Sequence, residues 1–138
     1  MQLTIDQCWE RLTSADHGVL ATVHEDRGVD AVPAVFAAVD GNLVIPVDTV
    51  KAKSGIRLQR LANLEADDRC ALIVDNYESD WSRLWWVRVH GRAAEVPPTD
   101  EWLHDLRRRY PAYREPGTIA SVLVIRPAVI IGWSAEAG

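Results

Sequence analysis

The sequence lacks any long apolar run, and no stretch of its 138 residues approaches the ~20 apolar residues that a membrane-spanning helix needs. Its first residues carry neither a basic region nor an apolar run, so we expect no secretory signal and a cytoplasmic location. Cysteine is scarce, and Cys8 and Cys70 lie too far apart to form a CxxC pair. In a reducing compartment we expect both to be buried thiols rather than redox groups or metal ligands.

Positive charge is also in short supply. The chain has 15 Lys and Arg against 20 Asp and Glu, which gives a net charge of −5. A general nucleic-acid binder draws much of its affinity from Lys and Arg on phosphates, so this balance argues against a nucleic-acid partner. Apolar residues make up 48% of the chain, which excludes wholesale disorder, and the length suits a single domain over residues 1–138.

The sequence has none of the short motifs that mark common enzymes. It contains no GxGxxG, GxxxxGK[ST], HExxH or GxSxG segment. Its four histidines are scattered without the spacing of a metal site, and no Ser or Cys has a recognisable nucleophile context. We therefore expect neither a metal site nor a catalytic triad built from the protein's own side chains, and no catalytic residue is assigned.

Short strands and tight turns dominate the pattern that is present. Thr4 and Gln7 form a capping-box signature, Pro33 interrupts a long β-branched run and predicts an edge or bulged strand, and Asp40-Gly41 is a strong hairpin signal. We predict a mainly β, antiparallel barrel with about three short helices. The expected helices cover 4–14, 54–64 and 100–109, and the expected strands cover 18–24, 29–39, 43–47, 70–74, 83–96, 118–125 and 128–133.

A basic segment follows the third expected strand. Lys51, Lys53 and Ser54 lead into the helix expected over 54–64, on which Lys53, Arg57 and Arg60 would share one face. Cations at a helix start oppose the helix dipole, and a bound anion would reverse that cost. The residues alone leave two interpretations open, a phosphate site or a solvated basic face, and the second is the commoner origin of such a charge run.

The six tryptophans contrast with a single Phe, and two of them are adjacent in the strand expected over 83–96. Alternation would place Trp85 on a core face and Trp86 on the opposite face together with Arg88, His90 and Arg92. A Trp beside two Arg is more typical of a subunit or ligand interface than of plain solvent surface, although either interpretation fits.

These segments together resemble a known family. The order is LATVH, VDAVPAVFAAVDG, LVIPVDTVKAKSGIRLQRLANL, CALIVDNYESDWSRLWWVRVHGRAA, LRRRYPAYR and a terminal GWSA. It resembles the pyridoxamine-phosphate-oxidase-like flavin and deazaflavin oxidoreductases, and more narrowly their actinobacterial coenzyme F420-dependent branch, over about residues 10–134. The resemblance implies an FMN-binding-like split β-barrel of antiparallel Greek-key topology, a homodimer, and two cofactor sites at the dimer interface.

The resemblance also implies where the cofactor lies. The cofactor phosphate would sit on Lys51 and Lys53, with Ser54 and Arg60 nearby, which favours the phosphate interpretation of the basic segment. The ring would lie along the second and third strands, and the partner subunit would close the site. The ring residues would include Val32, Pro33, Pro46, Val47 and Asp48, and the closing residues, chosen by strand alternation, would be Trp85, Trp86 and Arg88.

The implied activity is transfer of hydride from reduced coenzyme F420 to a small unsaturated organic substrate. The arginine-rich strand and the C-terminal Arg and His elements of the vitamin-B6 oxidases are missing, which weakens that assignment. Because the cofactor would carry the reactive chemistry, the absence of catalytic motifs from the sequence is consistent with an oxidoreductase. The alternatives are an FMN-dependent oxidase or reductase of the same fold and a cofactor-binding carrier without turnover.

Overall fold

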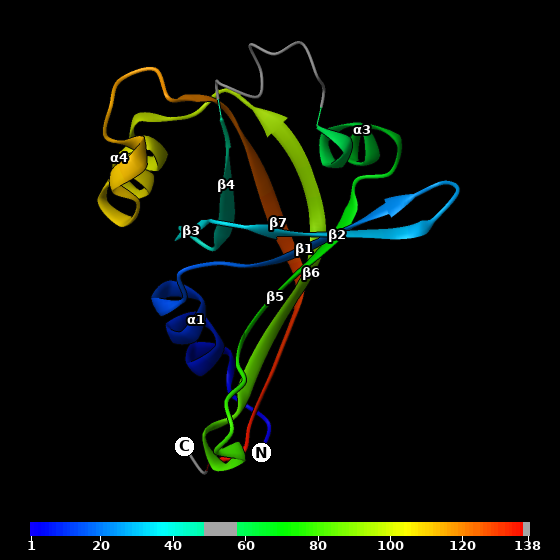
Figure 1. The fold of residues 1–138 in the computed structure, drawn as a ribbon, viewed down its shortest axis with the longest axis vertical. Helices are drawn as coiled ribbons and strands as arrows, with labels where there is room; N and C mark the ends of the chain where they lie inside the picture. The colour runs from blue at the N-terminus through cyan, green and yellow to red at the C-terminus, as the bar shows by residue number, and fades with distance from the viewer. Residues whose placement is uncertain (49–57, 137–138) are drawn as a thin grey trace.

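The computed structural model describes residues 1–48 and 58–136. Within them, seven antiparallel strands form one sheet in the order β2-β1-β5-β6-β7-β4-β3, which confirms the mainly β, antiparallel prediction (Figure 1). The strands are β1 (Gly18–His24), β2 (Gly28–Ala34), β3 (Ala37–Val39), β4 (Asn42–Asp48), β5 (Arg69–Asn76), β6 (Trp85–Val96) and β7 (Ile119–Ser134). The helices are α1 (Ile5–Ser14), α3 (Gln59–Ala66) and α4 (Asp100–Arg109), with short 3₁₀ turns η1 (Trp81–Arg83) and η2 (Pro111–Tyr113).

Local signals define the first helix and the tightest turn. The Thr4 side chain accepts a hydrogen bond from the Gln7 amide, and the Gln7 side chain accepts one from the Thr4 amide, so the predicted capping box is present. Asp40 and Gly41 adopt φ values of 48° and 77°, which is the left-handed backbone that a two-residue hairpin requires. The predicted hairpin between β3 and β4 is therefore confirmed.

The break in the second expected strand lies two residues beyond the predicted position. The edge strand that Pro33 predicted is confirmed, because β2 lies at the edge of the sheet. Pro33 itself remains inside β2, paired with Val19, since an edge strand tolerates a residue that has no N–H group to donate. The chain leaves the sheet at Val35 and Phe36 instead. Phe36 is completely buried, and its amide donates to the Tyr110 hydroxyl at 3.1 Å. The demand to bury this ring, rather than the proline, ends the strand.

The last two expected strands are a single strand, so the predicted break at Arg126-Pro127 is wrong. β7 runs without interruption through Pro127, which pairs with Gly91 where the β6–β7 register shifts. A Cβ on Gly91 would collide with the carbonyl group of Arg126, so only glycine fits this close approach. The register shift accommodates the proline, so β7 continues as one strand from Ile119 to Ser134.

Helix α3 begins later than the helix predicted over 54–64. Leu58 is its N-cap with an extended backbone (φ −62°, ψ 135°), and helix α3 starts at Gln59. A single helix over 54–64, with Lys53, Arg57 and Arg60 on one face, is therefore wrong. Leu58 packs against the core, and that contact sets the chain direction before the helix begins.

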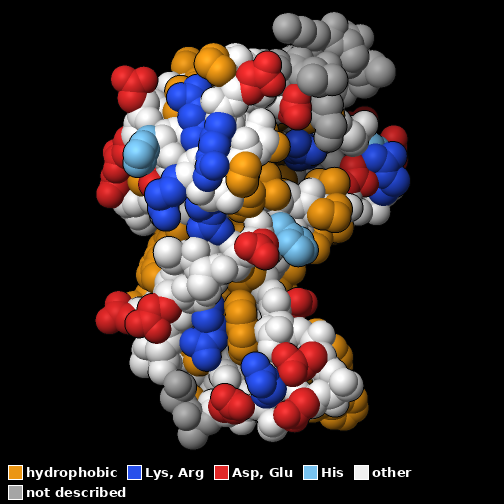
Figure 2. Space-filling view, turned by 60° about the vertical axis from the view of Figure 1, so that its left-hand side comes forward, with side chains coloured by type: hydrophobic (Ala, Val, Ile, Leu, Met, Phe, Trp, Pro, Cys, Tyr) orange, Lys and Arg blue, Asp and Glu red, His pale blue; other side chains and the backbone are white. Residues whose placement is uncertain are grey.

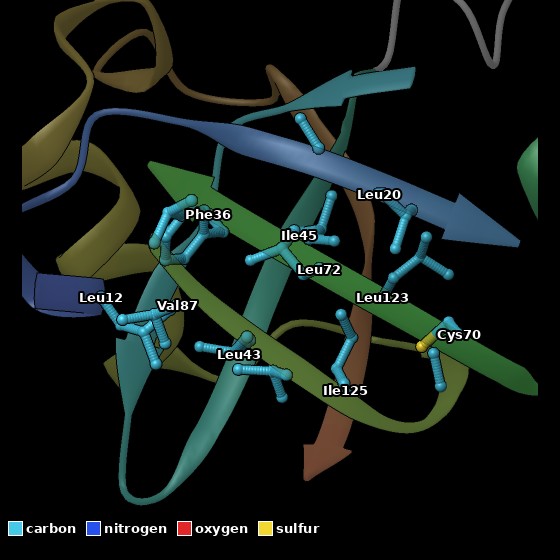
Figure 3. Packing of buried hydrophobic residues seen from close by; sticks show 14 of the residues in the cluster. Leu12, Leu20, Phe36, Leu43, Ile45, Cys70, Leu72, Val87, Leu123 and Ile125 are labelled. Carbon is cyan, nitrogen blue, oxygen red and sulfur yellow. The ribbon is translucent and has the colours of Figure 1, made fainter. Parts of the chain in front are cut away.

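The main core lies between the coiled sheet and helices α1 and α3 (Figure 3). A second, smaller cluster forms under α4, where Leu106 contacts the outer sides of β3, β4 and β7. The two clusters share β4, whose alternate residues face opposite clusters. Fully buried residues of the main core include Leu12, Leu20, Phe36, Leu43, Leu72, Val87, Val89 and Ile125.

The two ends of the chain lie together at one end of the molecule (Figure 1). The amino group of Met1 donates to the Ser134 carbonyl at 2.6 Å, and the Leu3 amide donates to the Gly132 carbonyl at 2.9 Å. Gly132 leaves room for Cys8 and Leu3, which a Cβ would displace. No helix among the described residues is long and apolar enough to cross a membrane.

Candidate cofactor site and outer sheet face

Arg60 lies in the first turn of α3 and interacts electrostatically with Tyr113 of η2. Its Nε atom is buried and has no hydrogen-bond partner among the described residues. Burial lowers the pKa of Arg60, whereas the neighbouring Tyr113 opposes that change. The pKa of Tyr113 is raised, mainly by burial and further by the charge of Asp48, and Arg60 acts in the opposite direction. The Tyr113 phenol is therefore influenced both by the partly buried Arg60 cation and by the Asp48 carboxylate.

Three of the expected phosphate residues, Lys51, Lys53 and Ser54, lie outside the described residues. The described chain ends at Asp48 in β4 and resumes at Leu58, one residue before α3. The basic segment therefore connects the two elements that carry Asp48 and Arg60. Of the expected phosphate residues, the structure describes Arg60 alone.

The predicted alternation of β6 is confirmed. Val87 and Val89 are fully buried in the main core, whereas Trp86, Arg88 and His90 lie on the opposite side of the strand. The Arg88 guanidinium lies 5.2 Å from the centre of the Trp86 ring, and its Nε donates to His90 Nε2 at 2.8 Å. The arginine is thus held between an indole face and an imidazole acceptor, a rigid arrangement for a surface side chain.

This side of the sheet continues across neighbouring strands. Cross-strand pairing places Trp86 beside Trp133 of β7, and Arg88 between Ile73 of β5 and Ile131 of β7. The same row continues from β5 to β1 and β2. We call these residues the outer sheet face: Val19, Pro33, Ile73, Trp86, Arg88, His90, Val129, Ile131 and Trp133.

The outer sheet face is apolar and open to solvent. Val19, Val129 and Trp133 are 39%, 49% and 38% exposed, although each is a large hydrophobic residue. Scattered exposed hydrophobic residues are ordinary, but a row of them across several strands is typical of an interaction surface. The structure thus brings Pro33, Trp86 and Arg88, three of the expected site residues, onto one face.

The remaining expected residues lie elsewhere. Trp85 points to the opposite side of β6 from Trp86 and packs against the main core, with the Arg11 guanidinium 5.4 Å from its ring centre. Val32 packs against the same core, Val47 is 3% exposed within it, and Pro46 is buried. The side chains of Val32 and Val47 therefore belong to the main core, and a ring along these strands would contact their backbone.

A groove joins some of these positions. Two cavities of about 280 and 370 Å³ share Asp16 and His17 at the start of β1. The first reaches Val19, Ile73 and Trp85, and the second reaches Pro33, Val35, Arg109 and Tyr110. The groove therefore connects Pro33 of the expected ring site with Trp85 of the expected closing segment.

His17, Arg109 and Tyr110 were not assigned to the site from the sequence, although LRRRYPAYR was one of the segments that carried the resemblance. The Tyr110 hydroxyl lies 2.8 Å from the Phe36 carbonyl oxygen and 2.7 Å from that of Asp16. Arg109 donates to the Thr13 carbonyl at 2.8 Å and so joins α4 to the end of α1. Arginines gather in the last turn of α4, and Figure 2 shows basic side chains clustered on the upper part of the molecule in that view.

Both cysteines are free and buried, as predicted. Burial raises the pKa of Cys70 to about 11, so the thiol is a poor nucleophile at neutral pH. The pKa of Cys8 is raised for the same reason. Among the described residues, no group of three or more His, Cys, Asp or Glu side chains could hold a metal ion.

Solved structures with the same fold cover almost the whole chain. An FAD-binding protein from Mesorhizobium loti is 21% identical with a TM-score of 0.72, over 96% of this chain and 95% of that chain. An FAD-binding protein from Mycobacterium smegmatis is 19% identical with a TM-score of 0.60, over 96% and 97%. A conserved hypothetical protein from Mycobacterium tuberculosis is 18% identical with a TM-score of 0.77, over 97% and 86%.

At these identities the likeness establishes the split-barrel fold and no more. No curated protein matches the sequence. The family comparison carries further, because the profile described as pyridoxamine 5'-phosphate oxidase matches residues 5–134. The chain therefore belongs to the pyridoxamine 5'-phosphate oxidase family.

Proposed function

We propose that this protein is an oxidoreductase, a single domain over residues 1–138 that works as a homodimer. It binds coenzyme F420 and transfers hydride to a small unsaturated organic substrate. The observation that carries the proposal is Arg60, a partly desolvated cation that follows the basic segment in the sequence and whose buried Nε has no partner in the described part of the chain. The cofactor named is the one implied by the family resemblance of that segment.

The environment of Arg60 fits a cofactor that carries a phosphate group. A buried donor without an acceptor costs free energy, and an anionic oxygen at this position would remove that cost. Lys51, Lys53 and Ser54 precede Arg60 in the chain and offer further donors. These four residues would hold the phosphate, and the negatively charged Asp48 would mark the edge of the phosphate site.

The outer sheet face supports the proposal that the protein works as a homodimer. A partner subunit would cover its exposed hydrophobic residues and bring Trp86 and Arg88 to the cofactor site. The Trp86–Arg88–His90 contact holds the guanidinium in one orientation, which reduces the entropy lost on binding. When bound, the deazaflavin supplies the hydride, and the protein's residues bind it, orient it and exclude water.

A flavin is the second candidate for the cofactor. Two proteins of the same fold, from Mesorhizobium loti and Mycobacterium smegmatis, are FAD-binding by name. A flavin nucleotide also carries phosphate, so the basic segment and Arg60 would serve it in the same way. A cofactor carrier without turnover is the third candidate.

Titration of the purified protein with coenzyme F420, FMN and FAD distinguishes the candidates. We expect micromolar binding of coenzyme F420 and reduction of a compound in a panel of unsaturated substrates. Binding of FMN or FAD alone would replace the proposal by the flavin version. Tight coenzyme F420 binding without reduction of any compound would favour the third candidate, a cofactor carrier without turnover.

A variant of the basic segment tests the phosphate assignment directly. We expect Lys53→Ala to weaken cofactor binding by about 1–3 kcal/mol, the scale of a hydrogen bond between charged groups. Arg108→Ala is a matched control, because Arg108 is exposed on α4 and pairs with Asp105. Unchanged affinity of Lys53→Ala would show that the basic segment is a solvated face.

A further inference from the structure

A separate cavity of about 580 Å³ lies between the second half of β6, β7 and the start of α4. Its position on β4 is at Asn42, the first residue of that strand, whereas the expected phosphate site follows Asp48, the last. Seven residues of strand separate the two by about 20 Å. The cavity is lined by Asn42, Asp68, Arg92, Ala93, Ala94, Val96, Pro97, Thr99, Trp102, Val124, Arg126 and Ala128.

The floor of the cavity is apolar and well packed. Val124 is 6% exposed and belongs to the cluster under α4, and Val96 and Trp102 pack against that cluster. Thr99 accepts a hydrogen bond from the Trp102 amide and caps α4, which fixes the helix turn that carries the indole. A volume of this size, with an aromatic wall, an apolar floor and polar groups at Asn42, Asp68, Arg92, Thr99 and Arg126, suits a small organic molecule that carries a polar group.

The rim of the cavity carries two arginines that face one another. Arg92 of β6 and Arg126 of β7 are directly paired in the ladder, an arrangement in which like charges repel. Asp68 compensates Arg92 with an ion pair of 2.5 Å. The Arg126 guanidinium has no hydrogen bond or ion pair to another residue in the described part of the chain. One positive charge therefore stands uncompensated beside an apolar floor.

We propose that this cavity binds a small aromatic monocarboxylate. The carboxylate would pair with Arg126 in the planar two-point geometry that guanidinium favours, and would relieve its repulsion from Arg92. The aromatic body would lie on Val124 against Trp102. The proposal does not depend on the cofactor assignment, because the cavity shares no residue with the groove or with the expected phosphate site.

The experiment uses 2-naphthoate as the probe and the neutral 2-naphthalenemethanol as its matched control. Both are titrated into the ¹⁵N-labelled full chain and followed by amide shifts. We expect 2-naphthoate to shift amides of residues 92–96, 99–102 and 124–128, and to bind about three- to tenfold more tightly than the alcohol. Equal affinity of the two compounds, or shifts confined to other residues, would overturn the proposal.

Variants of the rim sharpen the result. We expect Arg126→Gln to lower the affinity for 2-naphthoate to that for the alcohol, and Arg126→Lys to retain part of the difference. Arg83→Gln, which removes an exposed arginine of η1 that pairs with Glu78, is expected to bind 2-naphthoate as the natural chain does. Displacement of 2-naphthoate by coenzyme F420 or FMN would place the probe at the cofactor site and would also refute the assignment.

Discussion

Replacement of Arg60 by methionine is expected to change stability and anion binding in opposite directions. Methionine keeps the unbranched apolar stem of arginine and removes the guanidinium, whose Nε is buried without an acceptor among the described residues. A residue that only supports the fold loses stability when it is truncated. A residue whose charge is kept for a ligand costs the free protein stability, so its removal is neutral or stabilising until the ligand is added.

The magnitude follows from the burial. An unsatisfied buried donor costs about 1–3 kcal/mol, and because the Arg60 side chain is only partly buried we expect the low end, about 1 kcal/mol. For a chain of this length, that corresponds to a rise of about 3 °C in the unfolding midpoint of Arg60→Met. The lost charge-assisted hydrogen bond is expected to weaken cofactor binding about tenfold.

Thermal unfolding followed by circular dichroism, with and without the cofactor that binds, measures both effects. Arg60→Lys keeps the charge and is expected to retain part of the affinity. Arg108→Met, an exposed arginine on α4, is the control for arginine loss as such and is expected to change the free energy of unfolding by less than about 0.5 kcal/mol. A lower midpoint for Arg60→Met together with unchanged cofactor affinity would show that Arg60 serves the fold and would refute the reasoning.

Three further outcomes are expected. Tyr110→Phe leaves the amide of the fully buried Phe36 without its acceptor and should lower the free energy of unfolding by about 1–3 kcal/mol in urea titrations; an unchanged midpoint would contradict this. Trp86→Ala should weaken dimerisation or cofactor binding, and a stable dimer with normal affinity in sedimentation and titration would refute the interface. A hydrogen bond from Arg69 holds the pKa of Asp67 at about 2, below its ordinary 3.8. This contribution to stability is present above about pH 4 and lost as the pH falls towards 2, so Asp67→Asn should flatten the fall in unfolding midpoint over that range, and an equally steep fall would count against it.

Signals that act within a few residues predicted the local structure well. The capping box at Thr4, the left-handed turn at Asp40 and Gly41 and the two faces of β6 all depend on backbone periodicity or on one side chain reaching its own backbone. Such interactions hardly depend on the rest of the fold. Their agreement with the structure is therefore physically reasonable.

The errors lie where distant contacts override a local pattern. A helix was predicted from residue 54, but Leu58 packs against the core in an extended conformation and α3 begins after it. Pro127 was predicted to split a strand, but its partner Gly91 lies far away in the sequence and accepts it at a register shift. The residues that contact Leu58 and Pro127 are distant in the sequence, so the neighbouring sequence does not predict these contacts.

The candidate site divides in the same way. The sequence alone identified the basic segment, the Trp86 and Arg88 side of β6 and the family, because residue types and spacing carry those signals. The groove at His17, the buried Nε of Arg60 that has no partner among the described residues and the cavity at Arg126 arise from the packing of elements that are distant in the sequence. Composition and periodicity determined a mainly β chain with an alternating cationic face. Only the tertiary structure decided which cations have partners, because burial and charge compensation depend on residues that are brought together from distant parts of the chain.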